Sequence, residues 1–438
     1  MTRAFVLHPD LKARPRPGAR LPERALEEAV GLARAIDLEI VGAEVVPLPK
    51  PDPGRLFGAG KVEALGERIA EAEVELVVVD GPLTPVQQRN LERAWKVKIL
   101  DRTGLILEIF AQRAATRERV LQVELAALEY AKTRLVRSWT HLERQRGGLG
   151  FVGGPGETQI EADRRAISER IKQIERRLEG VAKTRDLHRA ARAKVPYPVI
   201  ALVGYTNAGK STLFNRLTRA DVKAEDMLFA TLDPTMREIR LPTGRKAILS
   251  DTVGFVSDLP TQLVAAFRAT LEEVLAADVI VHVRDMSHPD AEMQAEDVLA
   301  VLADLGVDEV RREGMIEARN KIDRLEPEAR AALLNETARR GDAVAVSALT
   351  GQGTQTLLAA VEARLTEGAE MRRVLAPVSD GAPLAWLHEH AEVLATRSIE
   401  SGTEIEARVM PDDFARFLRR FPDVREAPSG HGLPKAAQ

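Results

Sequence analysis

The sequence predicts an α/β protein with four parts: an open N-terminal sheet, a long antiparallel coiled-coil hairpin, a doubly wound, mostly parallel sheet, and a small α+β C-terminal unit. Strand-like and helix-like runs alternate in two regions, two heptad-patterned segments separate these regions, and one apolar strand leads directly into a glycine-rich turn. A chain of 438 residues is too long to fold around a single hydrophobic core. We expect domains at residues 1–111, 112–194, 195–368 and 373–438.

The first region contains four apolar runs with the length and composition of strands. They lie at Ala4–Leu7, Ile40–Val46, Val74–Val79 and Val97–Leu100. Helical patterns lie between them, near Pro22–Ile36, Lys61–Ala72 and Pro85–Trp95. This alternation predicts an open sheet that is covered by helices.

Two apolar seams with coiled-coil spacing follow. The first contains Leu121, Leu125, Leu128, Leu135, Trp139 and Leu142, and the second contains Ile160, Ile167, Ile171, Ile174, Leu178 and Val181. The connecting segment 147–156 has six glycines in ten residues, so neither helix is expected to continue through it. The pattern predicts an antiparallel helical hairpin.

The C-terminal region has its own pattern. After a linker at Ala376–Pro383 we expect a helix, a strand at Glu404–Val409 and a short helix near Asp413–Arg420. The last residues, Ala427–Gln438, resemble a loose tail.

The composition restricts the class of protein. The absence of cysteine excludes disulfides and thiolate metal sites and fits a reducing cytosol. The N-terminus has no apolar signal stretch, and no run approaches the roughly 18 apolar residues of a membrane span. We therefore expect a soluble, cytoplasmic protein without a membrane span.

A phosphate-loop motif follows the apolar strand Val199–Val203 and precedes a helix. It consists of Gly204, Tyr205, Thr206, Asn207, Ala208, Gly209, Lys210 and Ser211. Glycines let backbone N–H groups surround phosphates, the lysine supplies a positive charge, and the serine hydroxyl reaches Mg²⁺. The strand-turn-helix context makes a nucleotide triphosphate site the expected function of this segment.

Two further segments are expected to contact the phosphates. A second strand ends in Asp251, Thr252, Val253 and Gly254, where Asp251 can hold a Mg²⁺-bound water and the Gly254 amide can contact the γ-phosphate. A switch segment precedes it, with Phe229, Ala230, Thr231, Leu232 and Asp233. Thr231 is expected to bind Mg²⁺ only when the third phosphate is present. Thr235 is the alternative, although it follows a proline and could cap a turn.

A fourth motif is expected to select the base. It consists of Asn320, Lys321, Ile322 and Asp323, supported by Ser347 and Ala348. A carboxylate accepts hydrogen bonds from guanine N1–H and N2–H₂, and adenine has no such edge. Four motifs in this order predict hydrolysis of GTP to GDP.

The group that activates water is not identifiable. Phe255 occupies the position where Ras-like enzymes have a glutamine, so intrinsic hydrolysis is expected to be slow. Lys210 and Thr231 are the best candidates for stabilising the reacting phosphate. Asn207 is a candidate ligand for K⁺, and the alternative that it only suits the turn stays open.

A basic stripe suggests an RNA partner. Residues 132–194 hold 16 lysines and arginines against 8 acidic residues, whereas the whole chain has a net charge of −3. Such a stripe can neutralise phosphates, although a solvated coiled-coil face with pairs such as Glu169–Lys172 fits it too. The glycine-rich connection favours RNA. The candidate contacts are Gly147, Gly148, Gly150, Phe151, Gly153, Gly154, Arg164 and Arg165.

The segment Arg146–Arg165, with Leu56–Lys61 and Phe229–Thr235, resembles the signature of the HflX family, in the Obg–HflX group of translational P-loop GTPases. The resemblance implies a GTPase that binds the large (50S) ribosomal subunit, is stimulated by it, and splits or rescues stalled or idle ribosomes under stress. It implies the phosphate, switch, base and Mg²⁺ contacts given above. We expect a monomer off the ribosome.

Some features depart from this pattern or allow alternatives. The strand before Asn320 carries Glu317 and Arg319, which suggests a half-exposed strand or a distorted approach to the base. The segment Gly58–Lys61 is too short for a phosphate loop, so a helix cap or an RNA contact is favoured over a second nucleotide site.

An RNA-modifying enzyme and a membrane-linked signalling GTPase are the competing functions. Neither has a supporting motif.

Overall fold

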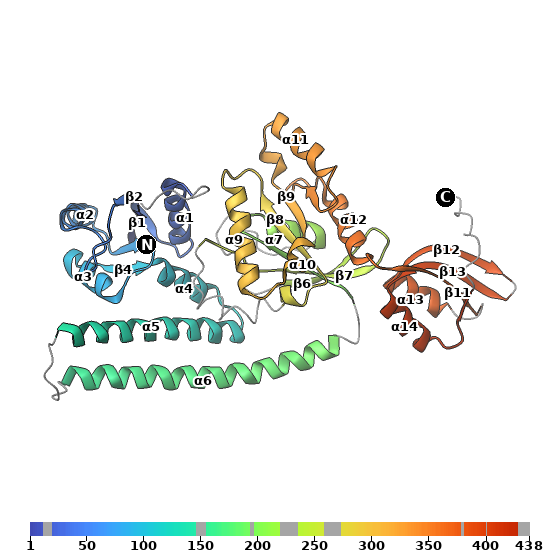
Figure 1. The fold of residues 1–438 in the computed structure, drawn as a ribbon, viewed down its shortest axis with the longest axis horizontal. Coiled ribbons are helices and arrows are strands. Elements are labelled where there is room, and N and C mark those ends of the chain that lie inside the picture. The colour runs from blue at the N-terminus through green and yellow to red at the C-terminus, as the bar shows by residue number, and fades with distance from the viewer. Residues whose placement is uncertain are drawn as a thin grey trace.

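The computed structural model describes residues 1–11, 20–145, 155–192, 197–219, 235–257, 273–377, 381–399 and 401–427. Three sheet-containing units follow one another along the molecule, and a pair of long helices runs beside the first two (Figure 1). The predicted α/β class is confirmed.

The N-terminal sheet unit is an open, parallel sheet in the order β2-β1-β3-β4. Its strands are β1 (Arg3–Leu11), β2 (Glu39–Leu48), β3 (Leu76–Val79) and β4 (Lys98–Asp101). Helices α1 (Pro22–Arg34) and α4 (Arg102–Arg113) pack on one face, and α2 (Ala59–Glu71) and α3 (Pro85–Trp95) pack on the other. All predicted elements are present, and α4 is an addition.

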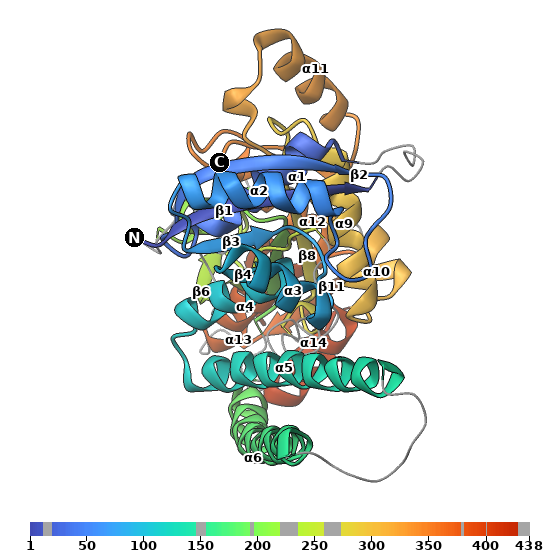
Figure 2. The ribbon, with the colours of Figure 1, turned by 90° about the vertical axis from the view of Figure 1, so that its left-hand side faces the viewer.

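The two long helices are α5 (Arg117–Gln145) and α6 (Pro155–Arg192), which run in opposite directions. Figure 2 shows that α5 lies between the N-terminal sheet unit and α6, and that the two helices cross. Leu121, Ile171 and Ile174 of the predicted seams are buried. Because α6 begins at Pro155, residues 155 and 156 belong to a helix and not to the expected loop 147–156. The rest of that loop lies outside the described residues.

The central sheet unit has the strand order β10-β9-β8-β5-β7-β6, in which only β6 is antiparallel. The strands are β5 (Val199–Gly204), β6 (Thr235–Arg240), β7 (Lys246–Asp251), β8 (Val279–Asp285), β9 (Ile316–Asn320) and β10 (Ala343–Ala345). Helices α7 (Lys210–Thr218) and α12 (Thr354–Leu365) contribute to the core on one face, and α9 (Ala291–Asp304) to the other. The other described helices of this unit are α10 (Glu309–Glu313), η1 (Ile322–Arg324) and α11 (Pro327–Thr337).

The C-terminal unit is an antiparallel sheet in the order β12-β13-β11-β14, with two helices. Its elements are β11 (Glu370–Ala376), α13 (Ala382–His390), β12 (Glu392–Ile399), β13 (Gly402–Val409), α14 (Pro411–Arg420) and β14 (Arg425–Glu426). Strand β11 begins before the expected domain start at residue 373, and β12 was not predicted. Among the residues that the structure describes, no helix combines the length and apolar character needed to cross a membrane.

Candidate nucleotide-binding site

The phosphate loop connects the end of β5 to the start of α7, as the motif predicts. Gly209 adopts a φ of 94°, a conformation that side chains other than glycine rarely adopt. A Cβ atom there would lie 2.3 Å from Asn320 Nδ2. Glycine at this position is thus required both by the turn and by the close approach of the base-recognition loop.

Lys210 is fully enclosed in this loop. Its Nζ donates hydrogen bonds to the carbonyl oxygens of Gly204 (3.1 Å) and Tyr205 (2.8 Å). Burial lowers the pKa of Lys210 to about 8, although Asp251 opposes this effect. A buried ammonium group surrounded by loop carbonyls has little hydration to lose, so it favours an anion such as a phosphate.

The proposed Mg²⁺ ligands of the described chain lie together. Ser211 Oγ donates to Asp251 Oδ2 at 2.7 Å, which places a hydroxyl and a carboxylate side by side next to Lys210. Oxygen donors of this kind are those that Mg²⁺ prefers when it also binds phosphates. The donor set therefore fits the metal that the sequence predicts.

The base-recognition residues converge on the phosphate loop. Asn320 Nδ2 donates to the carbonyl oxygen of Ala208 at 2.8 Å, and Asn320 Oδ1 accepts from the Ala348 N–H at 2.9 Å. Ser347 Oγ donates to Asp323 Oδ1 at 2.5 Å. Lys321 pairs with Asp285 at 2.8 Å. One side chain, Asn320, thus joins three segments that are far apart in the sequence.

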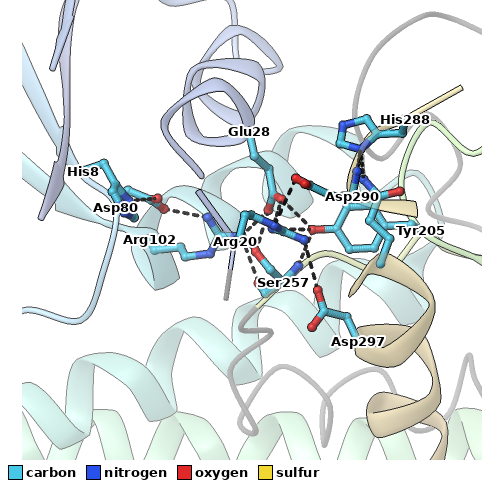
Figure 3. Close-up of polar contacts among 11 residues, drawn as sticks. His8, Arg20, Glu28, Asp80, Arg102, Tyr205, Ser257, His288, Asp290 and Asp297 are labelled. Atoms are coloured by element: carbon cyan, nitrogen blue, oxygen red, sulfur yellow. Dashed lines mark hydrogen bonds and ion pairs between the residues drawn. The ribbon is translucent and has the colours of Figure 1, made fainter. Parts of the chain in front are cut away.

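Some predicted contact residues direct their side chains away from this site. Thr252 Oγ1 donates to the Leu202 carbonyl at 2.6 Å, and Val253 and Ile322 are buried in hydrophobic clusters. Any nucleotide contact that they make would come from the backbone. The Tyr205 hydroxyl points toward the N-terminal sheet unit, where it donates to Glu28 at 2.6 Å (Figure 3).

The switch residues Phe229, Ala230, Thr231, Leu232 and Asp233 lie outside the described residues. Thr235, the alternative Mg²⁺ ligand, opens β6 and is paired in register with Asp251. It therefore belongs to a strand and does not cap a turn.

Asn207 is exposed and has a left-handed φ of 58°. Asparagine tolerates this conformation better than most residues, as the interpretation that it suits the turn requires. A role in binding K⁺ stays a proposal.

Phe255 has a structural role that the sequence does not reveal. It is 2% exposed and belongs to a hydrophobic cluster that also contains Leu105 and Ile106 of α4. Its backbone N–H donates to the Gly204 carbonyl at 3.1 Å, and its carbonyl accepts from the Thr206 N–H at 2.7 Å. The residue that replaces the Ras-like glutamine thus packs inside the protein.

The expectation of a half-exposed or distorted strand before Asn320 was wrong. Strand β9 lies between β8 and β10, and its charged side chains form ion pairs with each other, with β8 and with α11. Glu317 pairs with Arg284 and Arg319, both at 3.1 Å, and Arg319 also pairs with Glu336 at 2.8 Å. These ion pairs explain how charges are accommodated in a buried strand.

Gly58 precedes α2 as its N-cap, and the Lys61 N–H donates to the Gly58 carbonyl at 3.0 Å. The Lys61 ammonium pairs with Glu44 at 2.7 Å. These contacts agree with a helix cap.

A doubly wound sheet with a phosphate loop after β5, a carboxylate at the end of β7 and a guanine-type motif after β9 defines the class of P-loop GTPases. Four family models match the chain in order. They are described as GTP-binding GTPase N-terminal (residues 23–111), GTP-binding GTPase Middle Region (113–192), 50S ribosome-binding GTPase (199–321) and HflX C-terminal domain (332–429).

Similar proteins support a narrower assignment. The chain is 54% identical over 397 residues to GTPase HflX of Magnetococcus marinus, with 90% of each chain covered. It is 40% identical over 398 residues to GTPase HflX of Escherichia coli, which covers 91% of this chain and 92% of that protein. The chain belongs to the HflX family and is a GTP hydrolase. Among solved structures, the chain is similar to a GTP-binding protein from Sulfolobus solfataricus in complex with GDP. The two sequences are 23% identical, the match covers 84% of this chain and 99% of that protein, and the TM-score is 0.44.

Proposed function

We propose that this GTPase binds the large (50S) ribosomal subunit, and that GTP binding and hydrolysis control this association in the cytoplasm. Its task would be to split or rescue stalled or idle ribosomes under stress. The match of residues 199–321 to a family described as 50S ribosome-binding GTPase supports the choice of partner.

The helical hairpin is the observation that carries the proposed RNA contact. Described basic side chains on α6 point into solvent, namely Arg164, Arg165, Arg170, Lys172, Arg176 and Arg177. Of these, Arg170 also pairs with Glu124 of α5 at 2.6 Å. An exposed row of this kind can replace counterions along an RNA backbone. The glycines of the connection and Phe151 are proposed as contacts at its tip.

The hairpin is joined firmly to the N-terminal sheet unit. Arg134 of α5 donates to Asp101 Oδ2 at 2.6 Å, and the Tyr130 hydroxyl donates to Asp101 Oδ1. Asp101 also caps α4 by accepting from the Gly104 N–H at 2.9 Å. The Arg134 guanidinium lies 4.6 Å from the centre of the Tyr130 ring. A force on the hairpin would therefore reach the sheet unit.

In the proposed reaction, the phosphate loop from Gly204 to Ser211 binds the phosphates and Asp323 binds the base. Ser211 and Thr231 would hold Mg²⁺, with Asp251 acting through a water. The metal would neutralise the charge on the phosphate oxygens. Because Phe255 is buried, the chain supplies no water-positioning group there, and we propose that the ribosome stimulates hydrolysis. A K⁺ ion at Asn207 is a second candidate.

GTP turnover with and without purified 50S subunits tests this proposal. We expect stimulation of at least about tenfold, which corresponds to roughly 1.4 kcal/mol of barrier. A variant that lacks residues 147–154 should keep intrinsic turnover and lose most of the stimulation. Equal turnover with and without 50S subunits would contradict the proposal.

The control by nucleotide can be measured separately. Co-sedimentation with 50S subunits should be stronger with a non-hydrolysable GTP analogue than with GDP, because the third phosphate orders the switch segment. Equal binding in the two states would show that the nucleotide does not control the association.

A further inference from the structure

The loop that follows β10 carries backbone groups of the proposed base site. Ser347, Ala348 and Leu349 are three consecutive residues of this loop. Two of them contact the motif that begins at Asn320: Ser347 Oγ donates to Asp323 Oδ1, and the Ala348 N–H donates to Asn320 Oδ1. The position of the loop therefore decides where its N–H groups lie relative to a bound base.

A second set of contacts to this loop comes from an arginine of helix α7. Arg216 Nε donates to the Ala348 carbonyl oxygen at 3.2 Å, and Arg216 Nη2 donates to the Leu349 carbonyl oxygen. A Cβ atom on Gly351 would lie 3.7 Å from Arg216 Cδ, so the side chain runs along the loop. The rigid fork of a guanidinium group suits two consecutive carbonyls, which a lysine could not bind together.

Peptide geometry extends the effect of Arg216 to an N–H group. The carbonyl of Ala348 and the N–H of Leu349 belong to one planar peptide group, in which they point in opposite directions. Because Arg216 fixes this carbonyl, the Leu349 N–H is directed away from the guanidinium. The preceding N–H, of Ala348, is fixed by Asn320. Guanine O6 is a hydrogen-bond acceptor, and neighbouring N–H groups of this kind are the donors that it requires.

The same arginine connects the base end of the site to the phosphate end. Helix α7 begins with Lys210 and Ser211 of the phosphate loop, and Arg216 lies on the same helix. The loop after β10 is thus joined to the phosphate loop by two routes. One is Arg216 on α7, and the other is Asn320, which bonds both Ala208 and Ala348.

We infer that Arg216 is a positioning residue for guanine recognition, which acts through the carbonyls of Ala348 and Leu349 on the N–H groups that meet O6. The inference rests on the proposed base site around Asp323. Donors that are ordered before binding reduce the entropy lost when the ligand binds. Without Arg216, the peptide between Ala348 and Leu349 can rotate, whereas the Asp323 carboxylate keeps its place. The loss of affinity should therefore concern the group at position 6 of the base.

Arg216→Gln in the full-length chain tests this role, with GDP and 6-thioguanosine diphosphate as ligands in calorimetric titrations. The thio analogue keeps the N1–H and N2–H₂ donors and replaces O6 by sulfur, a weaker acceptor. We expect GDP affinity to fall by about tenfold and the affinity for the analogue by about threefold or less. The preference of the wild type for GDP over the analogue should shrink accordingly.

Two further variants accompany this measurement. Arg216→Lys can donate to only one of the two carbonyls at a time, so it should lose about threefold in GDP affinity. Arg219→Gln, at an exposed position directly after the same helix, is the matched control and should keep both wild-type affinities.

GTP turnover without ribosomes provides a second readout. Arg216 contacts the base loop and not the phosphates, so Arg216→Gln should raise KM by about tenfold and keep kcat within about twofold. Unchanged GDP affinity in Arg216→Gln would overturn the inference. Equal losses for GDP and the thio analogue would also overturn it, since they would indicate a general loosening of the site. Failure of the base site itself is distinguishable, because Asp323→Asn would then leave GTP affinity unchanged.

Discussion

Asp323 is the residue that we propose for recognition of the base, and its Oδ1 accepts a hydrogen bond from Ser347 Oγ. In Asp323→Asn an amide N–H₂ would face the N1–H and N2–H₂ donors of guanine. We expect GTP affinity to fall by about 100-fold, and affinity for xanthosine triphosphate to rise because its 2-oxo group is an acceptor. Fluorescence titration with labelled nucleotides measures both. Asp304→Asn, at an exposed position of α9, is the control, and unchanged GTP affinity in Asp323→Asn would exclude this role.

The phosphate loop and the motif that begins at Asn320 could be placed in the fold from the sequence because each is local and lies at the end of a strand. Asn320 illustrates the limit: its place in the motif was predicted, but its hydrogen bonds to Ala208 and Ala348 depend on the folded sheet. Arg216 belongs to no motif, and its hydrogen bonds to Ala348 and Leu349 span 132 and 133 residues of sequence. The sequence holds no local signal for them, because the folded sheet brings α7 beside the loop that follows β10.

At the scale of elements, β8 and β9 show how a core strand accommodates charge. His282 and Arg284 of β8 lie opposite Glu317 and Arg319 of β9 in register. Because charged residues interrupt the apolar pattern of β9, the sequence predicted a half-exposed or distorted strand there. It could not show that the interruptions compensate each other, since partners on neighbouring strands are set by register. Helix α4 was missed for a different reason. Its residues Leu105–Phe110 are buried on almost every side, so they show no amphipathic stripe from which a helix could be predicted.

His282 makes the stability of this sheet depend on pH. Burial, with Arg284 and Lys210, lowers its pKa from 6.5 to about 4, although Glu317 opposes this. Between these values the unfolded chain binds a proton that the folded chain does not, so stability is complete above pH 6.5 and is lost as the pH falls toward 4. The expected loss between pH 7 and pH 5 is about 2 kcal/mol.

Thermal unfolding of wild type and His282→Gln at pH 7 and pH 5 checks this value. The variant lacks the titrating group, so its midpoint should fall less between the two pH values than that of wild type. Equal shifts would show that His282 does not contribute. An NMR titration provides an independent measure, because the His282 ring should stay neutral at pH 5.5 in the folded chain.

At the scale of the whole molecule, the core itself is continuous between units. One hydrophobic cluster contains residues of α1, α4 and α5 together with Tyr205, Phe255 and Val256 of the central sheet unit. The C-terminal unit is connected by Arg245–Asp413 (3.7 Å) and Lys246–Glu389 (3.5 Å). Local patterns predicted the sheets of the units but not the contacts between them, because Val123 and Ala126 of α5 belong to a second apolar face that the heptad seam does not include.

The basic side chains of α6 are exposed and lie on a helix outside the nucleotide site. Removing their charge should therefore weaken the proposed binding to 50S subunits and leave nucleotide binding unchanged. The exposed pair Arg164 and Arg165 provides a test. In Arg164→Gln/Arg165→Gln, the slope of log affinity for 50S subunits against log salt should decrease by about 2, one for each lost phosphate contact. Arg419→Gln/Arg420→Gln removes an equally exposed pair from α14, at the other end of the molecule, and should keep the wild-type slope. Identical slopes in both variants would place the RNA contact elsewhere.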